Sequence, residues 1–439
     1  MGLVTPEKIR ILQNKLYFKA KQDKACRFHQ LYDKIYRQDI LLHAWRVARA
    51  NKGKPGVDGL TFDQIEQQGL EQWLEKLGQE LRNKTYKPEA VRRVMIPKVG
   101  GGERPLGIPT IKDRVAQTAA KLILEPIFEA DFEDCAYGYR PRRSAQQAVE
   151  EVRKAMDQGY TEVVDADLSK YFDTIPHDAL MKCLAKRVSD RHMLHLIKMW
   201  LKVPVQEMDE QGMKRISGGK GSNQGTPQGG VISPLLANIY MHRYLRYFYQ
   251  TGKHQEFRAR IVNYADDFVI LSRGKAQEAL VWTRQVMGKI GLTLNETKTC
   301  IRQARTETFD FLGFKCGPEM HRKRGTMYLT IQPSDKSIAK MKEGIAKVLE
   351  SNMTAPWYEV RDELNAKLRG WAGYFRIGTR LMAFRAVDNY VDEKVRSFLR
   401  RRHKVSSRGT RQFPSDAIFG KLGVQRLRTL HLGNRVGLE

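Results

Sequence analysis

The alternation of apolar and polar residues predicts a helical beginning to the chain. In residues 1–90, apolar side chains such as Leu31, Ile35 and Leu42 recur at helical spacing, and Lys and Arg occupy much of the opposite face. The Gly- and Pro-rich run 51–59 ends the first helical segment. We therefore expect amphipathic helices with a basic outer face.

Three later stretches have the pattern of β-strands. Residues 92–109 predict a hairpin that turns through three glycines, and residues 161–167 predict a strand that ends in an aspartate. In residues 260–271, two β-branched and apolar runs flank the polar step Tyr-Ala-Asp-Asp. This pattern predicts a tight β-hairpin with adjacent carboxylates at its turn.

Helical patterns separate and follow these strands. We expect a helix over residues 113–132 and another over 145–157, which Ser144 would cap. From residue 333 onward the composition becomes helical and rich in Lys and Arg, with a long helix expected over 381–399. The sequence thus predicts a mixed α and β body followed by a helical bundle.

The adjacent acids at the 260–271 turn are the first candidates for chemistry. A solvated turn would explain one aspartate, but Asp266 and Asp267 repel each other and ordinary turn chemistry needs only one. Clustered carboxylates are the ligands that a hard cation such as Mg²⁺ requires. A third acid in a matching context, Asp167 at the end of a predicted strand, favours a metal site.

Three motifs in a fixed order carry a family resemblance. They are D-x-x-x-x-F from Asp167 to Phe172, Q-G-T-P-Q-G-G-x-x-S-P-L-L-A-N from Gln224 to Asn238, and Y-A-D-D at 264–267. With these motifs the sequence resembles the bacterial group II intron-encoded reverse transcriptase/maturase family. The resemblance implies an α+β right-hand polymerase fold with fingers and palm, a helical N-terminal extension and an α-helical thumb.

The resemblance also divides the chain into four expected segments. Residues 1–90 would form the N-terminal helical extension and the start of the fingers, and residues 91–325 the fingers and palm. Residues 326–400 would form the thumb or maturase domain, and residues 401–439 a basic nucleic-acid-binding segment. Since no cysteine follows Cys316, we do not expect the metal-binding endonuclease domain that some family members carry.

The resemblance implies a two-metal polymerase site. Its expected catalytic and metal-binding carboxylates are Asp167, Asp266 and Asp267. They would hold two Mg²⁺ ions, with Mn²⁺ as an alternative and the backbone carbonyl of Leu168 as a further ligand. Asp165, on the same strand face as Asp167, and Asp173, which is typical of a helix cap, compete for this role. The match to the family selects Asp167.

A second set of residues is expected to bind the incoming dNTP, on the same resemblance. These residues are Lys98, Arg104, Phe172, Gln228, Gly229 and Lys298. Lys98 and Arg104 bracket the fingers turn, where solvated charges are the competing explanation. Phe172 would exclude a ribose 2′-hydroxyl, although a palm core aromatic is its rival role and Tyr171 fits that role better. Lys298 would protonate the pyrophosphate, unless it is an ordinary surface charge.

A third set is expected to contact nucleic acid. These residues are Arg140, Arg142, Arg143, Phe311, Gly313, Arg400, Arg401 and Arg402. The first three stand in a Gly/Pro loop that would touch the template backbone. The segment 309–314 resembles the primer grip, although core packing explains its aromatics equally well. The last three belong to the basic run 396–411, for which a solvated tail is the alternative.

Charge and composition agree with a nucleic-acid partner. The formal net charge of +28 over 439 residues suits either a polyphosphate partner or a ribosome-like basic protein. No apolar run approaches the roughly 20 residues that span a bilayer, so no membrane partner is expected. The five cysteines are widely spaced and form no C-x-x-C pair, which predicts reduced thiols in a cytosol. The family resemblance implies a bacterial cytosol, with the protein either free there or associated with the nucleoid.

The expected function is that of an RNA-directed DNA polymerase of a group II intron. Its partners would be an RNA template, a DNA or RNA primer, dNTPs, target DNA and its own intron RNA, whose splicing and retrohoming it would assist. The alternatives are a domesticated enzyme of DNA repair or phage defence, a splicing-only RNA-binding maturase and an RNA-templated RNA polymerase. The intact aspartates argue against the splicing-only protein, and Phe172 argues against the RNA polymerase.

Overall fold

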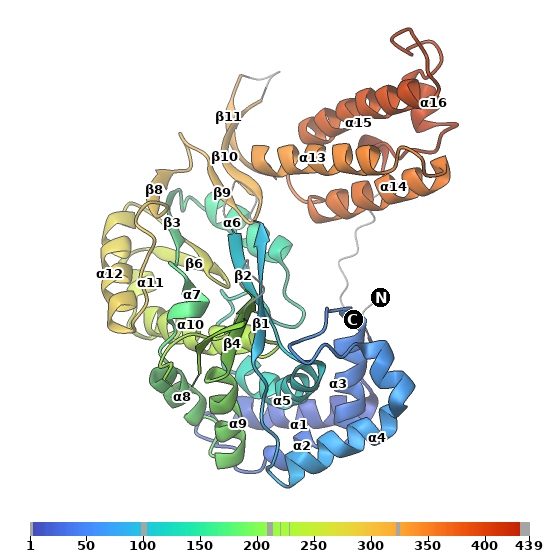
Figure 1. Ribbon diagram of the computed structural model, residues 1–439. Coiled ribbons are helices and arrows are strands. Elements are labelled where there is room, and N and C mark those ends of the chain that lie inside the picture. The colour runs from blue at the N-terminus through green and yellow to red at the C-terminus, as the bar shows by residue number, and fades with distance from the viewer. Residues whose placement is uncertain are drawn as a thin grey trace.

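The computed structural model describes residues 3–97, 103–208, 214–219, 221–227, 229–321 and 325–430. Within these ranges the chain forms a mixed α/β body, with N-terminal helices at one end and a C-terminal helical bundle at the other (Figure 1). No helix in the described ranges is long and apolar enough to cross a membrane. All five cysteines lie in these ranges as free thiols.

The N-terminal part is helical, as its apolar periodicity predicted. Its helices are α1 (Glu7–Gln22), α2 (Tyr32–Ile35), α3 (Gln38–Ala50) and α4 (Phe62–Arg82). Thr61 and Gln64 form a reciprocal capping box at the start of α4. The buried ring of Trp45 meets Phe62 and Trp73 edge to face at 5.1 and 5.3 Å. These aromatic contacts hold α3 and α4 together across the predicted loop at 51–59.

Helix α5 (Ile111–Glu129) is the buried element against which α1, α2 and α3 pack. It begins two residues before the predicted start and ends three residues earlier than predicted, with Thr110 as its side-chain cap. Val115, Ala119 and Ile123 are fully buried. These three residues belong to the buried apolar face of the helix.

The central sheet is antiparallel and has the strand order β6-β7-β3-β8. Its strands are β3 (Glu162–Asp167), β6 (Ala259–Tyr264), β7 (Asp267–Ser272) and β8 (Cys300–Gln303). Both the predicted strand at 161–167 and the predicted hairpin at 260–271 are therefore confirmed.

Apolar side chains from alternate positions cover both faces of this sheet. Val164 and Phe268 join a core with α10 (Ser233–Gln250) and α12 (Ala276–Lys289). Val163 and Leu271 join a second core with α6 (Ala145–Asp157), whose predicted Ser144 capping box is present. The sheet is thus buried on both sides, and its polar residues gather at the strand ends.

A second sheet has the order β2-β1-β4-β5. Its strands are β1 (Val91–Pro97), β2 (Glu103–Ile108), β4 (Pro204–Met208) and β5 (Lys214–Gly218). The β1–β2 hairpin matches the expectation for 92–109, but the β4–β5 hairpin was not predicted. Strand β1 pairs with β4 in parallel, with Val91 opposite Val205, which is a long-range contact that local sequence cannot reveal.

Short helices connect the two sheets. They are α7 (Tyr171–Thr174), α8 (His177–Ala185), α9 (Arg191–Leu201) and α11 (Lys253–Glu256). The prediction that Asp173 caps the helix near Pro176 is wrong. Asp173 lies inside α7, and Pro176 precedes α8 without a side-chain cap. Pro176 still suits this place, because a proline has its φ angle fixed near the value that a helix start needs.

The C-terminal part begins with a third sheet, of order β11-β10-β9. Its strands are β9 (Phe309–Phe311), β10 (Phe314–Met320) and β11 (Met327–Pro333). The bundle that follows contains α13 (Asp335–Ser351), α14 (Trp357–Tyr374), α15 (Leu381–Arg402), the short α16 (Ser415–Phe419) and a 3-10 turn (Leu427–Thr429). The ring of Phe314 lies 4.8 Å from that of Phe375 and joins sheet to bundle.

The segment after α15 folds back onto the bundle. Trp357 donates its indole N–H to the carbonyl of Leu422 at 3.0 Å, and the buried carboxylate of Asp388 accepts from the backbone N–H of Leu427 at 2.7 Å. The described chain as far as residue 430 therefore packs with the bundle, and the boundary expected at residue 401 does not separate it.

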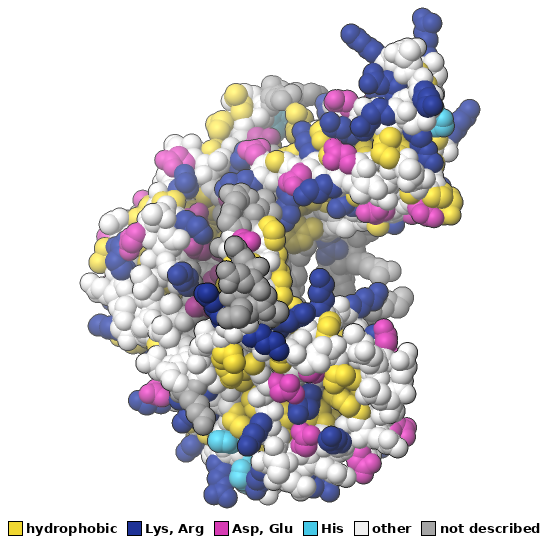
Figure 2. Space-filling view, in the orientation of Figure 1, with side chains coloured by type: hydrophobic (Ala, Val, Ile, Leu, Met, Phe, Trp, Pro, Cys, Tyr) yellow, Lys and Arg dark blue, Asp and Glu magenta, His cyan; other side chains and the backbone are white. Residues whose placement is uncertain are grey.

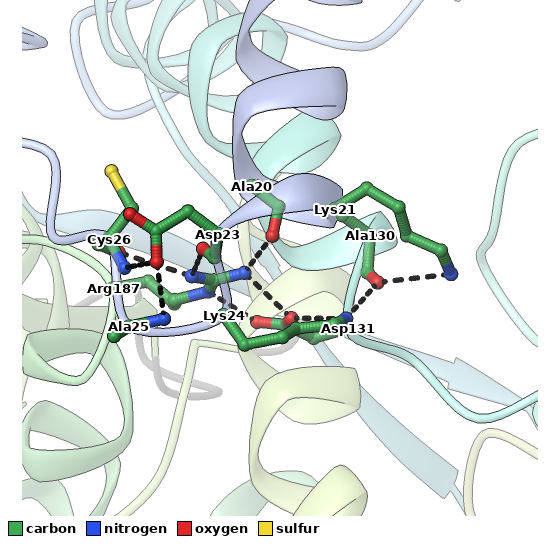
Figure 3. Close-up of polar contacts among 9 residues, drawn as sticks. All are labelled: Ala20, Lys21, Asp23, Lys24, Ala25, Cys26, Ala130, Asp131 and Arg187. Atoms are coloured by element: carbon green, nitrogen blue, oxygen red, sulfur yellow. Dashed lines mark hydrogen bonds and ion pairs between the residues drawn. The ribbon is translucent and has the colours of Figure 1, made fainter.

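The buried side chain of Arg187 joins the N-terminal helices to the rest of the body (Figure 3). Its guanidinium forms a bidentate ion pair with Asp131, with N···O distances of 2.7 and 2.9 Å. It also donates to the backbone carbonyls of Ala20, Asp23 and Cys26. Every N–H direction of this guanidinium is therefore used to hold α1 and the loop after it.

We expect Arg187→Met to lower the stability of the chain by about 3–5 kcal/mol, because it leaves the buried Asp131 carboxylate without its main partner. Thermal and urea unfolding midpoints of the full chain would measure the change. Lys24→Ala is the matched control. Its ammonium pairs with the same carboxylate at 3.3 Å from an exposed position, so its loss should cost less than about 1 kcal/mol. Equal effects of the two substitutions would refute this role for Arg187.

Candidate active site

Strand register brings the three predicted aspartates to one end of the central sheet. Asp167, the last residue of β3, is the cross-strand partner of Asp267, the first residue of β7. Asp267 also pairs with Tyr264 across β6 and β7, and Ala265 and Asp266 form the turn between them. Ala265 takes the left-handed conformation, with φ of 61°. The turn is therefore tight, and it places two adjacent carboxylates beside the third.

Asp167 is held by residues that follow α12, one of the helices that pack on the central sheet. Lys298 donates from its ammonium to Oδ2 of Asp167 at 3.0 Å, and the Asn295 side chain donates to the same oxygen at 3.2 Å. The backbone N–H of Asn295 donates to the Asp167 carbonyl at 2.8 Å. The Lys298 side chain is 65% exposed, and its ion pair with Asp167 raises the pKa of Lys298. Sequence reasoning missed Asn295.

The cluster carries more negative charge than its own cations offset. Partial desolvation, then repulsion from Asp266 and Asp167, raises the pKa of Asp267 to about 6, although its side chain keeps contact with solvent. Burial likewise raises the pKa of Asp165 to about 6, against the attraction of Arg302. Such mutual repulsion is what a bound cation would relieve.

The donor chemistry fits a hard divalent cation. Asp167, Asp266 and Asp267 supply carboxylate oxygens, the ligands that such ions prefer. Leu168 follows Asp167 directly, and its backbone bridges to Leu294. In the described part of the chain, no three His, Cys, Asp or Glu side chains are already gathered closely enough to grip an ion. The carboxylates would therefore have to draw together when a cation binds.

Several predicted nucleotide contacts lie where the structure gives no side chain. Lys98 and Gln228 are outside the described residues. Arg104 lies in β2 opposite Ile96, but its side chain is also outside the described part. Their roles stay predictions.

Gly229 makes the close backbone approach that its sequence suggested. It has φ of 103°, and a Cβ built there would lie 2.1 Å from the carbonyl oxygen of Gly107 in β2. Only glycine fits such a position. The backbone at Gly229 therefore lies directly against strand β2 of the β1–β2 hairpin.

Phe172 and Tyr171 are both largely buried, but they make different contacts. The Tyr171 hydroxyl donates to the carbonyl of Ala237 at 2.6 Å, which fixes it in the core as expected. Phe172 is 7% exposed, and its ring meets the edge of Tyr139 at 6.3 Å. Tyr139 itself is 46% exposed. The aromatic pair of Phe172 and Tyr139 therefore closes the core beside the carboxylates.

The loop at residues 135–139 supports the turn that carries Asp266. Asn263 in β6 exchanges backbone hydrogen bonds with this loop, at 2.8 Å to Cys135 and 2.8 Å to Tyr137. The Asn238 side chain donates to the Gly138 carbonyl at 2.7 Å, and the Asn263 side chain donates to the Ala265 carbonyl at 2.9 Å. Both asparagines are buried. Sequence reasoning missed this support, although a polar residue inside the apolar pattern of β6 was a usable signal.

The predicted template-contacting arginines divide into different roles. Arg140 is buried, forms a bidentate ion pair with Glu129 and donates to the carbonyls of Glu133 and Ala136. The hydrogen bonds of its guanidinium are made inside the protein, so the expectation that Arg140 contacts the template is wrong. Arg143 pairs with the exposed Asp134 at 2.7 Å, and Arg142 is exposed.

The other predicted nucleic-acid residues also differ from one another. Phe311 is buried in the core between sheet and bundle, so core packing explains it rather than contact with a primer. The Gly313 carbonyl accepts from the Ser337 hydroxyl at 2.8 Å, at the start of α13. Arg402 donates to the Ala355 carbonyl at 2.7 Å, whereas Arg401 is exposed and Arg400 is half-buried. Arg401 remains the member of this trio that faces solvent fully.

Two family models match the chain. The model described as reverse transcriptase (RNA-dependent DNA polymerase) matches residues 96–316, and the model described as group II intron, maturase-specific domain matches residues 338–413. The first spans the central sheet with all three aspartates, and the second spans the helical bundle.

Two curated relatives extend this match. Protein YkfC of Escherichia coli is 33% identical over 387 residues, which cover 80% of this chain and 97% of that protein. Group II intron-encoded protein LtrA of Lactococcus lactis is 30% identical over 351 residues, covering 65% of this chain and 56% of that protein. A telomerase structure from Candida albicans aligns over 82% of this chain and 68% of that one, at 14% identity and a TM-score of 0.43.

We expect Gly138→Ala to loosen the turn at 264–267. A Cβ at this position would lie 2.5 Å from the backbone nitrogen of Ala265, so the turn or the loop must shift, at a cost of about 1–3 kcal/mol. Faster hydrogen exchange in residues 264–267 and a lower unfolding midpoint would show it. Gly370→Ala is the control, since nothing lies within 4 Å of its built Cβ. Unchanged exchange in Gly138→Ala would contradict the supporting role of the loop.

We expect Asp267→Asn to make the chain more stable above pH 6 in the presence of a chelator. A carboxyl whose folded pKa is raised from 3.8 to about 6 binds more protons folded than unfolded between these values. Stability should therefore fall as pH rises from about 4 to 6 in the wild type, and less steeply in the variant. Melting temperatures across this range measure the slope. Asp178→Asn, an exposed acid in the first turn of α8, should keep the wild-type slope; an Asp267→Asn profile that also kept it would refute the repulsion.

Proposed function

We propose a function for this chain from the family to which it belongs, the reverse transcriptases encoded by group II introns, and from the geometry of its three aspartates. It copies an RNA template into DNA by adding dNTPs to a DNA or RNA primer. The observation that carries the proposal is the register that sets Asp167 against Asp267 with Asp266 in the adjoining turn. Enzymes of this family use divalent metal ions.

For the chemical step, Asp167, Asp266, Asp267 and the Leu168 carbonyl would hold two Mg²⁺ ions, with Mn²⁺ as an alternative. When bound, such ions activate the primer 3′-hydroxyl and stabilise the leaving pyrophosphate oxygen. Lys298 keeps its proton because its ion pair with Asp167 raises its pKa, and it would give that proton to the pyrophosphate. The loop at 135–139 keeps the turn in register during the reaction.

Nucleotide selection falls to the residues around Phe172. We assign Phe172 the exclusion of a ribose 2′-hydroxyl, with Tyr139 packed against its ring to keep it in place. Lys98 and Arg104 would neutralise the triphosphate from the β1–β2 hairpin. Gln228 and Gly229 would support the base, and the close approach of Gly229 to Gly107 in that hairpin supports this assignment.

The helical bundle would grip the nucleic acids. Figure 2 shows Lys and Arg side chains on both sides of the hollow between the α13–α15 bundle and the rest of the body. Such cations supply sequence-independent affinity for phosphates. We infer that template and primer lie there, and that Arg142 and Arg401, both exposed, are among their contacts.

The maturase role follows from the same membership. We propose that the chain binds its own intron RNA, assists its splicing and copies it into target DNA during retrohoming. A bacterial cytosol, at or near the nucleoid, would supply these partners. The second candidate is a domesticated relative that acts in DNA repair or phage defence. The chain spans nearly the whole of YkfC and about half of LtrA.

We expect the wild type to extend a primer on an RNA template with dNTPs and Mg²⁺, and Asp266→Asn to lose this activity. Changing a residue that merely orients a metal ligand typically costs 10- to 100-fold, so removing a ligand should cost more than about 100-fold. The rate of primer extension measures it, and Asp178→Asn serves as the control for lost charge. A folded wild type that binds RNA tightly without extending a primer would move the function to a splicing-only maturase.

A further inference from the structure

A basic cavity of about 570 Å³ lies on the side of the central sheet that α10 and α12 cover. It is lined from the ends of α5 and α8, from the second half of α10 and from α12. Helix α10 meets the sheet through Tyr244, whose ring lies 5.7 Å from that of Phe268. Arg243, Arg246 and Tyr247 of the same helix line the cavity instead. Part of α10 therefore stands between this cavity and the sheet that carries the aspartates.

The charge of the cavity wall is almost entirely positive. Its cationic lining residues are Lys24, Lys186, Arg187, Arg243, Arg246 and Lys289, against the single carboxylate of Asp131. Figure 3 shows that both oxygens of this carboxylate are already engaged, by Arg187 and by Lys24. The other four cations, Lys186, Arg243, Arg246 and Lys289, come from the end of α8, from α10 and from α12, and Asp131 is the one acid among the described residues that line the cavity. A pocket of this kind suits a phosphate-bearing ligand.

The excess of positive charge also affects His242, which lines the cavity. Burial, together with the smaller effects of Arg246, Arg140 and Lys186 and against the attraction of Asp131, lowers the pKa of His242 to about 4. The Nδ1 atom of His242 is buried without a hydrogen-bond partner in the described part of the chain. A neutral imidazole in this place does not add to the repulsion among the cations.

An aromatic platform stands at the rim. The Tyr247 side chain is 49% exposed, and its ring lies parallel to that of Trp282, with 5.7 Å between centroids and 13° between planes. One ring face is thus supported by Trp282 while the residue keeps wide access to solvent. An exposed aromatic face beside cations is what proteins use to stack an unpaired base while its phosphates are held.

We propose that this cavity binds the phosphates and one unstacked base of a single-stranded RNA segment, at a site separate from the hollow proposed for template and primer. The combination of recessed cations and an aromatic face favours a nucleotide over a lipid headgroup, which offers no base. The inference rests on the proposed function, because the intron RNA is the partner that would supply such a segment. It adds to that function a second RNA contact, which does not hold the template and which lies beside α10 and α12.

The test uses the full chain saturated with unlabelled RNA template and DNA primer. A short fluorescein-labelled single-stranded RNA is then titrated in, and its anisotropy reports binding outside the occupied template–primer hollow. We expect Lys186→Glu with Arg246→Glu to weaken this binding by at least about tenfold. The slope of log K against log salt should flatten by about 1.4, for two lost phosphate contacts on a single strand.

Matched variants separate this site from general charge. Lys76→Glu with Lys198→Glu makes the same charge change at two exposed positions outside the cavity, and it should retain near wild-type binding. Tyr247→Ala should weaken binding by about 5- to 100-fold through lost stacking, and Tyr247→Phe should not. Primer extension by the charge-reversed variant should match the wild type, which shows that fold and polymerase are intact.

Three results would overturn the inference. The first is that the wild type, saturated with template and primer, binds no second RNA. The second is that both charge-reversed pairs lose RNA binding equally. The third is that the wild type binds phosphatidylglycerol vesicles instead of RNA and that the cavity variant loses this vesicle binding. Failure of the wild type to extend a primer would instead refute the proposed polymerase. The two failures are therefore distinguishable in one set of experiments.

Discussion

The antiparallel pairing of β3 with β7 is the constraint on which the site depends. It sets Asp167 opposite Asp267 and, two residues further in, Asp165 opposite Val269. Because side chains alternate along a strand, a slip of one residue would exchange the side chains that β3 gives to the two cores and would separate the two carboxylates. Apolar residues bury both faces of this sheet. The packing that stabilises the fold therefore also sets the geometry of the acids.

Holding the three carboxylates close together lowers the stability of the folded chain. Carboxylates held at adjoining positions raise one another's pKa, as at Asp267, and Lys298 on Asp167 offsets only part of the repulsion. The surrounding contacts must therefore resist the tendency of the turn to open. Gly138 lies against Ala265 with no room for a side chain, and two buried asparagines bind the loop to the turn. Rigid support around mutually repelling groups is what a preorganised site requires.

Local pattern predicted the elements whose signals are local. The two hairpins, the Ser144 cap and the buried face of α5 follow from spacing and residue type, and the three motifs located the carboxylates. The β4–β5 hairpin and the bound state of Arg140 did not follow. Arg140 and Arg142 stand two residues apart in one loop, yet one is buried on Glu129 and the other is exposed. That difference depends on where α5 ends, which is a tertiary contact and not a property of the loop.

Helix α10 connects the features that the chemistry needs. At its start the Ser233 hydroxyl donates to the Pro227 carbonyl at 2.9 Å, and further along Asn238 holds Gly138. Its middle supports Phe268, next to Asp267, and its end carries Arg246 into the basic cavity. At 18 residues it is about 27 Å long. Helix α10 thus contacts the loop that contains Pro227, the loop at 135–139 and the sheet. RNA held at its far end would therefore act on the same helix that supports the aspartates.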